Sequence, residues 1–425
     1  MSTPPADPMD IFLAAPPGLE PALLAEAKAA GFAAPRAVPG GVETSGPWSE
    51  AWRANLVLRG ASRVLVRVAS FRALHLAQLD KRSRKLDWAA ILRPDQPVRV
   101  EATCRKSRIY HAGAAAQRIA RAIEEELGAP AAFVGGHGGE AAIRNAAGEA
   151  AIRNAAGEAA IRNAAGDGTA REASGETLDA DGPAPLRVMA RIDNDLVTIS
   201  LDASGEPLHR RGHKPAVAKA PMRETLAALF LHDCGYDGSE PLLDPMCGSG
   251  TFVLEAAELA AGLAPGRSRP FAFERLASFD PAAWAGMKRA AAPSPAPVPE
   301  RRFHGSDRDD GAIRAATANA ERAGLGDWTE FRRLAVSDLE RPAGPPGLVM
   351  VNPPYGARIG DKGPLKGLHA ALGRTLLERF SGWRVGLVTS EADLARATGL
   401  PFLPPGPPVP HGGLKVRLHR TAPLP

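Results

Sequence analysis

The second half of the chain, from about residue 206, alternates short apolar strands with amphipathic helices, and this alternation constrains the fold more than any other feature. Strands joined by helices in this order form βαβ units, whose strands lie parallel in one sheet. The sequence therefore predicts a doubly wound α/β domain, closed by an alternating edge strand at 414–420 that pairs antiparallel. Two proline-rich stretches, 265–299 and 400–410, are predicted to be loops. The expected strands are 241–244, 302–306, 329–334, 348–351 and 384–389, and the expected helices are 220–231, 251–261, 311–323 and 365–380.

The first half predicts a mixed α+β structure. An apolar run at 11–15 precedes a helix at 16–30 that Gly31 closes, and an alternating strand follows at 62–70. We therefore expect two small α+β units before the doubly wound domain. The second unit comprises a short helix end at 88–92, a strand at 97–103, a helix at 113–127 followed by Gly128, and a hairpin at 186–201 that turns at Asp193, Asn194 and Asp195.

The nine-residue unit GEAAIRNAA occurs three times in tandem, beginning at Gly139, Gly148 and Gly157. A period of nine matches neither the heptad nor the eleven-residue repeat, so the copies form no continuous coiled-coil seam. Identical copies indicate a recent duplication of the coding DNA. We interpret residues 135–182 as a surface insertion without a function of its own.

Cysteine usage and hydropathy exclude several classes of protein. The three cysteines, Cys104, Cys234 and Cys247, are too few and too scattered for a disulfide framework, and the histidines lack the spacing of metal ligands. The N-terminus lacks the order of a signal peptide, and no apolar run approaches the roughly 18 residues of a membrane span. We therefore expect a soluble cytoplasmic protein without a bound metal.

The strongest local motif is LLDPMCGSGT at 242–251. An apolar strand ends in Asp244, turns through Gly248 and Gly250, and opens a helix at Thr251. Glycines let the backbone approach a bound ligand, and the helix N-terminus offers free amides to a carboxylate. The alternative is a tight strand-to-helix turn that binds nothing.

The chemistry of this turn favours one class of cofactor. It lacks both the Gly-Lys-Ser/Thr ending of a phosphate-binding loop and the G-x-G-x-x-G order of a dinucleotide site. An acid at the strand end, Asp244, repels a pyrophosphate but suits an ammonium group. S-adenosylmethionine carries both an ammonium and a carboxylate, so we expect this cofactor in a turn that also contains Met246 and Cys247.

Two acids follow later strands of the predicted sheet. Asp307 stands where the strand at 302–306 stops, and an acid there can bind both hydroxyls of a ribose. A solvated turn acid is the alternative, because Asp309 and Asp310 are close by. Asp338 follows the third strand, and it suits either an adenine amine or a helix cap or turn.

The fourth strand runs into Asn352-Pro353-Pro354-Tyr355. The side-chain oxygen of Asn352 and the carbonyl of Pro353 can accept the two N–H bonds of an aryl amine, while Tyr355 stacks on the base. The alternative is a rigid turn with an asparagine cap. Together with the glycine turn, this loop predicts methyl transfer to an exocyclic amine by positioning, without a strong general base.

Basic residues gather in three clusters. The formal net charge of +5 and the pI of about 9.3 permit a polyanionic partner. Lysine and arginine bind phosphates without sequence preference, although a single cluster is more often a solvated surface. The predicted RNA-binding residues are Lys81, Arg82, Arg84 and Lys85, then Arg105, Lys106 and Arg108 beside Tyr110, and finally Arg210 and Arg211.

These motifs together resemble one family. DPMCGSGT, NPPYGARIG and the preceding SLDASGEPLHRRGHKPAVAKAPMRETLAAL are similar to the THUMP-domain class I RNA methyltransferases, above all to the bacterial group that makes N2-methylguanosine in 23S ribosomal RNA. Relatives in the family act on tRNA. The likeness covers nearly the whole chain apart from the insertion. It implies a Rossmann-like, seven-stranded class I methyltransferase domain at 206–425, preceded by an α+β region with a ferredoxin-like segment at 1–70 and a THUMP RNA-binding domain at 71–205.

The resemblance also implies roles for residues that match the family's motifs. Arg223 and Glu224, in the helix before the first strand, would flank the cofactor. The family's S-adenosylmethionine loop corresponds to Asp244, Gly248 and Gly250, its ribose acid to Asp307, its adenine-side acid to Asp338, and its amine-binding catalytic loop to Asn352, Pro353, Pro354 and Tyr355.

Some expectations depart from the family or stay open. Certain bacterial members are fusions with a second methyltransferase that makes N7-methylguanosine, and because this chain ends soon after the first catalytic domain, we expect that second activity to be absent. The insertion falls inside the THUMP region. The alternatives are a tRNA guanine-N2 methyltransferase, an N6-adenine methyltransferase, and a non-catalytic RNA-binding ribosome assembly factor.

Overall fold

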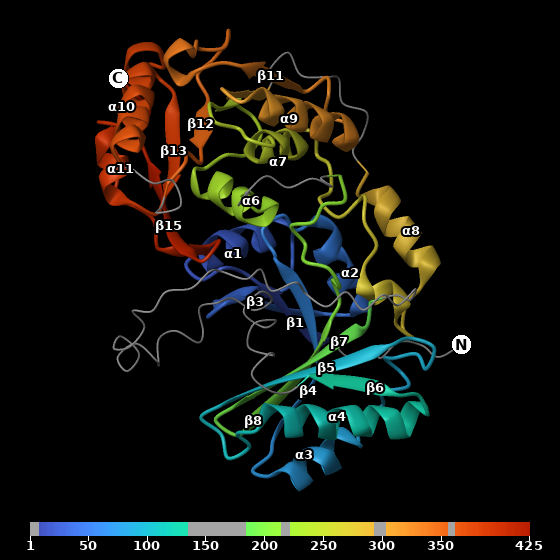
Figure 1. Ribbon diagram of the computed structural model, residues 1–425. Coiled ribbons are helices and arrows are strands. Elements are labelled where there is room, and N and C mark those ends of the chain that lie inside the picture. Colours follow the sequence, from blue (N-terminus) through green and yellow to red (C-terminus); the bar gives the residue numbers. More distant parts are fainter. Residues whose placement is uncertain (1–7, 135–183, 214–221, 293–302, 356–361) are drawn as a thin grey trace.

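The computed structural model describes residues 8–134, 184–213, 222–292, 303–355 and 362–425. The nonapeptide repeats fall outside these ranges. The described chain forms two sheets with helices packed on them, one from each half of the chain (Figure 1). Within these ranges, no helix is long and apolar enough to cross a membrane, and no group of His, Cys, Asp and Glu side chains is placed to hold a metal ion.

The second half forms a seven-stranded sheet in the order β11-β10-β9-β12-β13-β15-β14, which confirms the predicted α/β fold. The first five strands are parallel, and β15 pairs antiparallel with both β13 and β14. The chain order reverses between β9 and β12, and parallel sheets bind ligands at such a reversal, beyond the strands' carboxyl ends. The strands are β9 Leu242–Asp244, β10 Phe303–Asp307, β11 Thr329–Arg333, β12 Leu348–Val351, β13 Arg384–Thr389, β14 Val409–His411 and β15 Leu414–Arg420.

Helices cover both faces of this sheet (Figure 1). Alternate residues of β12 show the division, because Leu348 and Met350 pack into one core cluster while Val349 and Val351 pack into the other. The continuous burial of β12 on both faces is what a central parallel strand requires. The helices of this half are α6 Glu224–Asp233, α7 Thr251–Ala260, α8 Pro281–Ala290, α9 Asp310–Ala323, α10 Lys362–Arg379 and α11 Ala392–Ala397.

Two predictions for this half are wrong. The strand at 414–420 is not the edge, because β14 lies outside it within the predicted loop, where Pro410 is tolerated as part of an edge strand. The predicted loop at 265–299 contains α8, whose start is marked by Asp280 accepting two backbone hydrogen bonds. Aspartate followed by proline is a helix-start signal, and the surrounding prolines obscured it.

The first half forms a single eight-stranded sheet in the order β2-β3-β1-β4-β8-β7-β5-β6. The predicted division at residue 70 lies inside β4, which pairs antiparallel with both β1 and β8. The two predicted units therefore share one continuous sheet. The strands are β1 Met9–Ala14, β2 Arg36–Val38, β3 Gly41–Gly46, β4 Arg63–Arg72, β5 Val98–Arg105, β6 Ala131–Val134, β7 Leu186–Asp193 and β8 Leu196–Asp202, and the helices are α1 Glu20–Ala29, α2 Trp48–Val57, α3 Leu76–Ser83 and α4 Ala112–Leu127.

Local turn chemistry in this half follows the sequence closely. Gly128 ends α4 in the left-handed region with φ 66°. Asn194 and Asp195 connect β7 to β8 with φ 50° and 63°, the two consecutive positive values that a tight hairpin requires. The helix end predicted at 88–92 is wrong, because that segment forms turns only.

The two halves pack through helices. α6 lies against α1, and α8 lies against α2 (Figure 1). Rings from both halves interlock beside α2, since Trp52 stacks on Phe273 with centroids 5.7 Å apart and meets Phe279 edge-on at 5.5 Å. This aromatic contact fixes the segment between α7 and α8 onto the first half of the chain.

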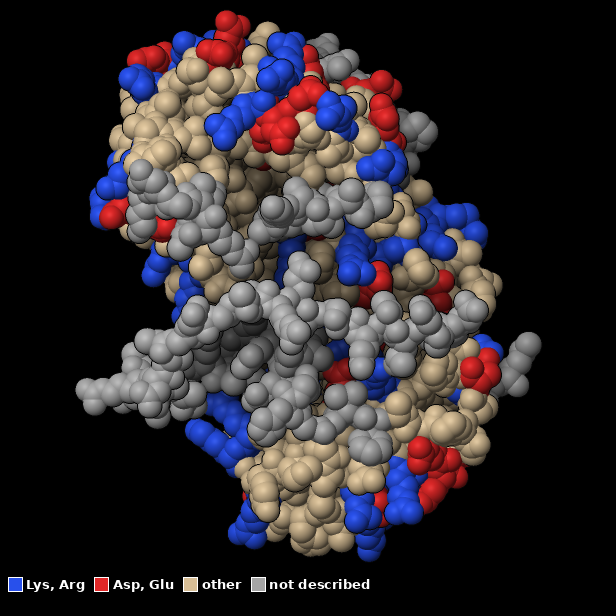
Figure 2. All heavy atoms as spheres, in the orientation of Figure 1, with Lys and Arg blue, Asp and Glu red and all other residues tan. Residues whose placement is uncertain are grey.

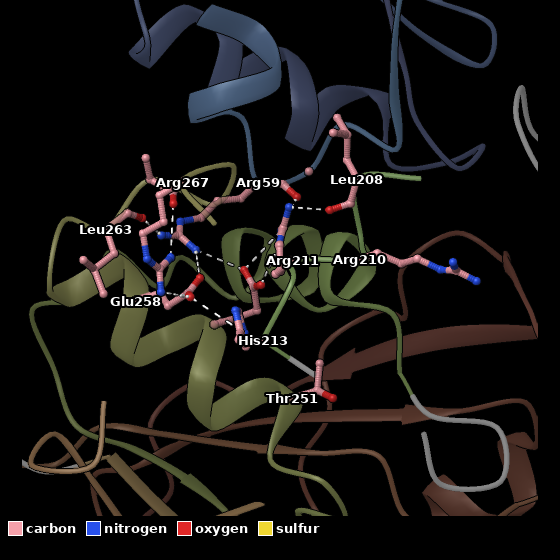
Figure 3. Close-up of polar contacts among 12 residues, drawn as sticks. Arg59, Leu208, Arg210, Arg211, His213, Thr251, Glu258, Leu263 and Arg267 are labelled. Atoms are coloured by element: carbon pink, nitrogen blue, oxygen red, sulfur yellow. Dashed lines mark hydrogen bonds and ion pairs between the residues drawn. The ribbon is translucent and has the colours of Figure 1, made fainter. Parts of the chain in front are cut away.

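A buried ionic network also joins the halves (Figure 3). Arg59, just after α2, lies 3.2 Å from Glu255 and 3.1 Å from Glu258, both on α7. Arg211, from the segment that connects the two sheets, lies 3.1 Å from Glu255 and donates to the Arg59 carbonyl at 2.8 Å. Arg267 contacts Glu258 at 2.7 Å. Three arginines thus neutralise two carboxylates inside the interface.

The prediction that Arg211 binds RNA is therefore wrong. Its side chain is buried, with an exposed fraction of 2%, and its guanidinium donates to Glu255 and to the carbonyls of Leu208 and Arg59. The adjacent Arg210 is exposed and pairs with Glu206 at 2.9 Å. Neighbouring arginines in one basic cluster thus have opposite structural roles.

The Arg59→Ala variant should be strongly destabilised. Arg59 is an ion-pair partner of both Glu255 and Glu258. Without it, these buried carboxylates are incompletely neutralised, so we expect the free energy of unfolding to fall by about 3–5 kcal/mol. Urea denaturation followed by circular dichroism measures it. Arg210→Ala is the matched control and should cost less than about 1 kcal/mol. Similar losses in the two variants would contradict a network that holds the halves together.

Candidate active site

The predicted glycine turn lies at the carboxyl end of β9, beside the reversal of strand order. Gly248 and Gly250 have φ of 51° and 85°, which glycine adopts without strain. The turn is tied to neighbouring elements, because the amide of Cys247 donates to the Ser306 carbonyl at 2.9 Å and the Asn319 side chain donates to the Ser249 carbonyl at 3.0 Å. The turn is therefore a fixed structure that opens α7 at Thr251.

Asp244 is buried beneath this turn without a positive partner. Its Oδ1 accepts the Met246 amide at 3.0 Å, and no arginine or lysine of the described residues pairs with the carboxylate. Burial, with a smaller contribution from the negative charge of Asp307, raises the pKa of Asp244 to about 8. A buried carboxylate in this state gains from any ligand that brings a cation.

Asp307 lies where the sequence predicts it, at the end of β10 and beside the glycine turn. Its Oδ2 accepts the Gly248 amide at 3.1 Å, and its Oδ1 accepts the Asp309 amide at 3.0 Å. In the sheet, Gly305 pairs with Asp244, so the two acids belong to neighbouring strand ends. Each carboxylate oxygen of Asp307 keeps acceptor capacity for a second donor.

The remaining predicted cofactor residues have less specific settings. The Thr251 hydroxyl lies 3.5 Å from the Met222 carbonyl, ahead of α6. Burial raises the pKa of Cys247 well above its usual range, so its thiol stays neutral and is no nucleophile. Asp338 is exposed in the short turn after β11 and accepts from the Ser337 hydroxyl at 3.1 Å. Its role at the cofactor stays a prediction.

Asn352 follows β12, the strand that pairs with β9 in the sheet. Its side-chain Oδ1 is buried and has no hydrogen-bond partner among the described residues. Pro353 beside it is buried, whereas Pro354 is exposed. Tyr355 packs partly against the core, and burial raises the pKa of its phenol to about 12. Residues 356–361 of the motif lie outside the described ranges.

Two predicted loops are thus brought together by the order of strands. Asp244 and Asn352 end adjacent parallel strands, and Asp307 ends the strand on the other side of β9. Among the described residues, the buried Asp244 carboxylate has no cationic partner and the buried Asn352 Oδ1 has no donor, and both stand at this edge of the sheet. Buried polar atoms almost always have partners, so the unsatisfied oxygen of Asn352, near a buried carboxylate without a cation, indicates a binding site for donors.

The predicted RNA-binding residues are mostly at the surface. On the face shown in Figure 2, lysines and arginines of the described residues are interspersed with acids. Arg84 already forms ion pairs with Asp80 and Glu125, which weakens its attraction to a phosphate group. The exposed members of the predicted set are Lys81, Arg82, Arg84, Lys85, Arg105, Lys106, Arg108 and Arg210.

Sequence reasoning missed residues that hold the site in place. Glu255 and Glu258 stand three positions apart in the otherwise apolar helix TFVLEAAELA, and acids on a fully buried helix indicate buried ion pairs. Arg269 is a second case. It donates to four backbone carbonyls between residues 204 and 210, and so clamps the segment that connects the two sheets.

Comparison with known families explains this arrangement. Residues 211–401 match the family model described as an RMKL-like methyltransferase domain, and residues 10–65 match the ferredoxin-like domain of RlmL. The second half of the chain therefore contains an RMKL-like methyltransferase domain. The first match lies within the second half of the chain, and the second covers the beginning of the first half, as far as β4.

Curated relatives extend the similarity over nearly the whole chain. The ribosomal RNA large subunit methyltransferase K/L of Syntrophotalea carbinolica is 32% identical over 407 residues, covering 92% of this chain and 51% of the relative. The protein slr0064 of Synechocystis, named as a candidate RNA methyltransferase, is 29% identical and is covered over 83% of its length. The chain spans about half the length of the K/L relatives that it matches along most of its own length.

Solved structures share the arrangement of both halves. A candidate methylase from Clostridium difficile 630 superposes with a TM-score of 0.77 at 25% identity, and the match covers 99% of both chains. The candidate methyltransferase SMU.472, solved in complex with SAH, has a TM-score of 0.76 at 23% identity over 100% of both chains. This chain therefore has the same two-sheet fold as those proteins.

The Asp244→Asn variant should stabilise the ligand-free protein in a pH-dependent way. Because the pKa of Asp244 is raised when folded, its stabilising contribution is complete below the unfolded pKa near 4 and is lost as pH rises towards 8. An asparagine side chain does not titrate, so the variant does not lose stability in this way as the pH rises. The stability difference should therefore grow between pH 4 and pH 8, by at most about 1.4 kcal/mol per pH unit, and level off above.

Thermal unfolding at several pH values measures this difference. Asp338→Asn, an exposed carboxylate of the same sheet edge, is the matched control and should change stability by less than about 0.5 kcal/mol at each pH. A constant difference between wild type and Asp244→Asn across the pH range would show that Asp244 is not an unpaired buried carboxylate.

Proposed function

We propose that this protein transfers a methyl group from S-adenosylmethionine to the exocyclic N2 amine of a guanine in structured RNA, with 23S ribosomal RNA as the substrate. Ribosomal RNA is supported by the K/L relatives, and the amine as acceptor is supported by the Asn352 loop. The choice of guanine N2 rests on the resemblance of the DPMCGSGT and NPPYGARIG motifs to that group of enzymes. Such a substrate places the reaction in the cytoplasm.

The buried, unpartnered Oδ1 of Asn352 is the observation that carries this proposal. An unsatisfied buried acceptor costs the fold about 1–3 kcal/mol, so its persistence indicates that a ligand satisfies it. An exocyclic amine has two N–H groups, and Oδ1 can accept one while the Pro353 carbonyl accepts the other. Two acceptors on one amine nitrogen draw its lone pair out of conjugation with the ring.

The residues around the glycine turn fit S-adenosylmethionine. The unpaired carboxylate of Asp244 suits its ammonium group, and the start of α7 offers amides to its carboxylate. Asp307 keeps acceptor capacity for the two ribose hydroxyls. An anionic cofactor such as a pyrophosphate would instead meet two carboxylates in the same place.

When bound, this cofactor supplies an electrophilic methyl group on a positively charged sulfur. Asn352 and Pro353 hold the amine nitrogen, and the Tyr355 ring offers a face on which the base can stack. The amine nitrogen would form its new bond to the methyl carbon as the carbon–sulfur bond breaks, with S-adenosylhomocysteine as the leaving group, and the surplus proton of the amine would pass to solvent water. Burial keeps the Tyr355 phenol protonated, so its contribution is positioning and not general-base catalysis.

The Asn352→Ala variant tests this assignment. Loss of one acceptor from the amine should lower kcat by about 100-fold or more, because transfer depends on that alignment. The Kd for SAH, measured by calorimetry, should change by less than about twofold, since Asp244 and Asp307 remain. Wild-type activity in Asn352→Ala would rule out the proposed role of this loop.

Nucleoside mapping identifies the substrate and the product. Mass spectrometry of 23S rRNA and tRNA from a deletion strain should show one missing N2-methylguanosine in the 23S rRNA, restored by the wild-type gene and not by Asn352→Ala. Loss of N2-methylguanosine from tRNA would show that tRNA is the substrate. Loss of N6-methyladenosine would show that the methylated base is adenine. No missing methylation in either RNA would favour a non-catalytic assembly factor.

A further inference from the structure

Three segments of the first half converge at one end of its sheet. The amide of Arg108, in the loop after β5, donates to the Asp195 side chain at 2.7 Å, and the amide of Ala73, just after β4, donates to the Asp195 carbonyl at 3.0 Å. Asp195 itself is in the β7–β8 turn. Figure 1 shows the loop after β5 beside that turn. Asp195 therefore connects all three segments.

Large apolar side chains are exposed at this end of the sheet. Tyr110 has an exposed fraction of 84%, the highest among the large hydrophobic side chains of the described residues. Leu74 and Leu196, adjoining the contacts to Asp195, are 39% and 41% exposed. Half of the six large exposed hydrophobic residues in the described chain thus belong to these three segments. Grouped exposure of this kind indicates a binding surface.

The same end carries positive charge. Arg105, Lys106 and Arg108 are exposed, and neither the Lys106 ammonium nor the Arg108 guanidinium forms an ion pair with an acid of the described residues. The nearby acid Asp193 is already paired with Arg191 at 2.7 Å. We refer to Leu74, Arg105, Lys106, Arg108, Tyr110 and Leu196 as the Tyr110 patch.

The loop that carries these residues is held rigidly before any ligand binds. The Ser107 hydroxyl donates to the Arg105 carbonyl at 2.7 Å and accepts the Asp195 amide at 3.0 Å. Ile109 is buried between the two exposed residues Arg108 and Tyr110. His111 then caps α4 by accepting the Ala114 amide at 3.0 Å. A preorganised surface loses little conformational entropy on binding.

We propose that the Tyr110 patch binds an unpaired segment of the RNA substrate, with one base stacked on the Tyr110 ring and the neighbouring phosphates bound by Lys106 and Arg108. The proposal rests on the proposed function, because it assumes an RNA substrate. Single-stranded nucleic acids are bound by aromatic rings that stack bases beside cations that contact the backbone. An A-form duplex offers no free base face to a tyrosine, so the patch should favour single strands.

Binding of a fluorescein-labelled 12-nucleotide oligouridylate, measured by anisotropy at several salt concentrations, tests the two contributions separately. Tyr110→Ala should weaken binding by about fivefold or more without changing the salt dependence, because stacking involves no counterion release. Tyr110→Phe is the matched control and should bind like wild type. Lys106→Ala should lower the slope of log Kd against log salt by about 0.7.

Several outcomes would overturn the proposal. Oligouridylate affinity of Tyr110→Ala within twofold of wild type would exclude stacking, as expected if the patch instead binds a protein. Tighter binding of a 12-base-pair RNA duplex than of the single strand would exclude an unpaired segment. Urea midpoints of the variants should equal that of wild type, because Tyr110 is exposed.

The methyltransferase proposal is tested independently of this patch. If Tyr110→Ala fails to weaken oligouridylate binding while wild type still methylates 23S rRNA and Asn352→Ala does not, only the patch is excluded. If wild type transfers no methyl group to any RNA, the proposed function itself falls. With both correct, Tyr110→Ala should raise KM for deproteinised 23S rRNA by about fivefold or more and leave kcat and the Kd for SAH unchanged.

Discussion

The ionic network of Arg59, Arg211 and Arg267 with Glu255 and Glu258 is the interaction on which the rest of the structure depends. Two carboxylates on α7 are removed from water, which is tolerable only while the arginines stay in place. α7 also begins at the glycine turn. The geometry of that turn is therefore linked through one short helix to residues of the other half, so the two sheets work as one body.

The candidate active site between the strand ends contains polar groups that lack interaction partners within the described residues. Among the described residues, no cation pairs with the buried Asp244 carboxylate, and no group donates to the buried Oδ1 of Asn352. Burial of the surrounding sheet, in which β12 is buried on both faces, offsets the free energy lost by burying these unsatisfied groups. Binding sites commonly lower the stability of the ligand-free protein, because groups that are positioned to bind a ligand lack hydrogen-bond or ionic partners without it.

The sequence predicts those parts of the structure that neighbouring residues determine. The strand ends at Asp244, Asp307 and Asn352 and the hairpin turn at Asn194 follow from local patterns, and the structure contains them. Features that depend on residues far apart in the chain could not be predicted from the sequence. Arg210 and Arg211 look alike in sequence, and only the distant position of Glu255 decides that one is exposed and the other buried. The outer strand β14 was hidden for a similar reason, because its pairing with β15 outweighs the low strand propensity of its proline.

The central position of β9 in its sheet has a consequence for the order of folding. Both of its neighbours, β10 and β12, are made after it during synthesis, and the parallel pairing of β12 requires everything between them to have emerged. The glycine turn therefore leaves the ribosome long before the asparagine loop that it must face. Such non-local pairing is slow, and the edge of β9 that pairs with β12 stays open in the meantime. The two loops can therefore face each other only after β12 has been made and has paired with β9.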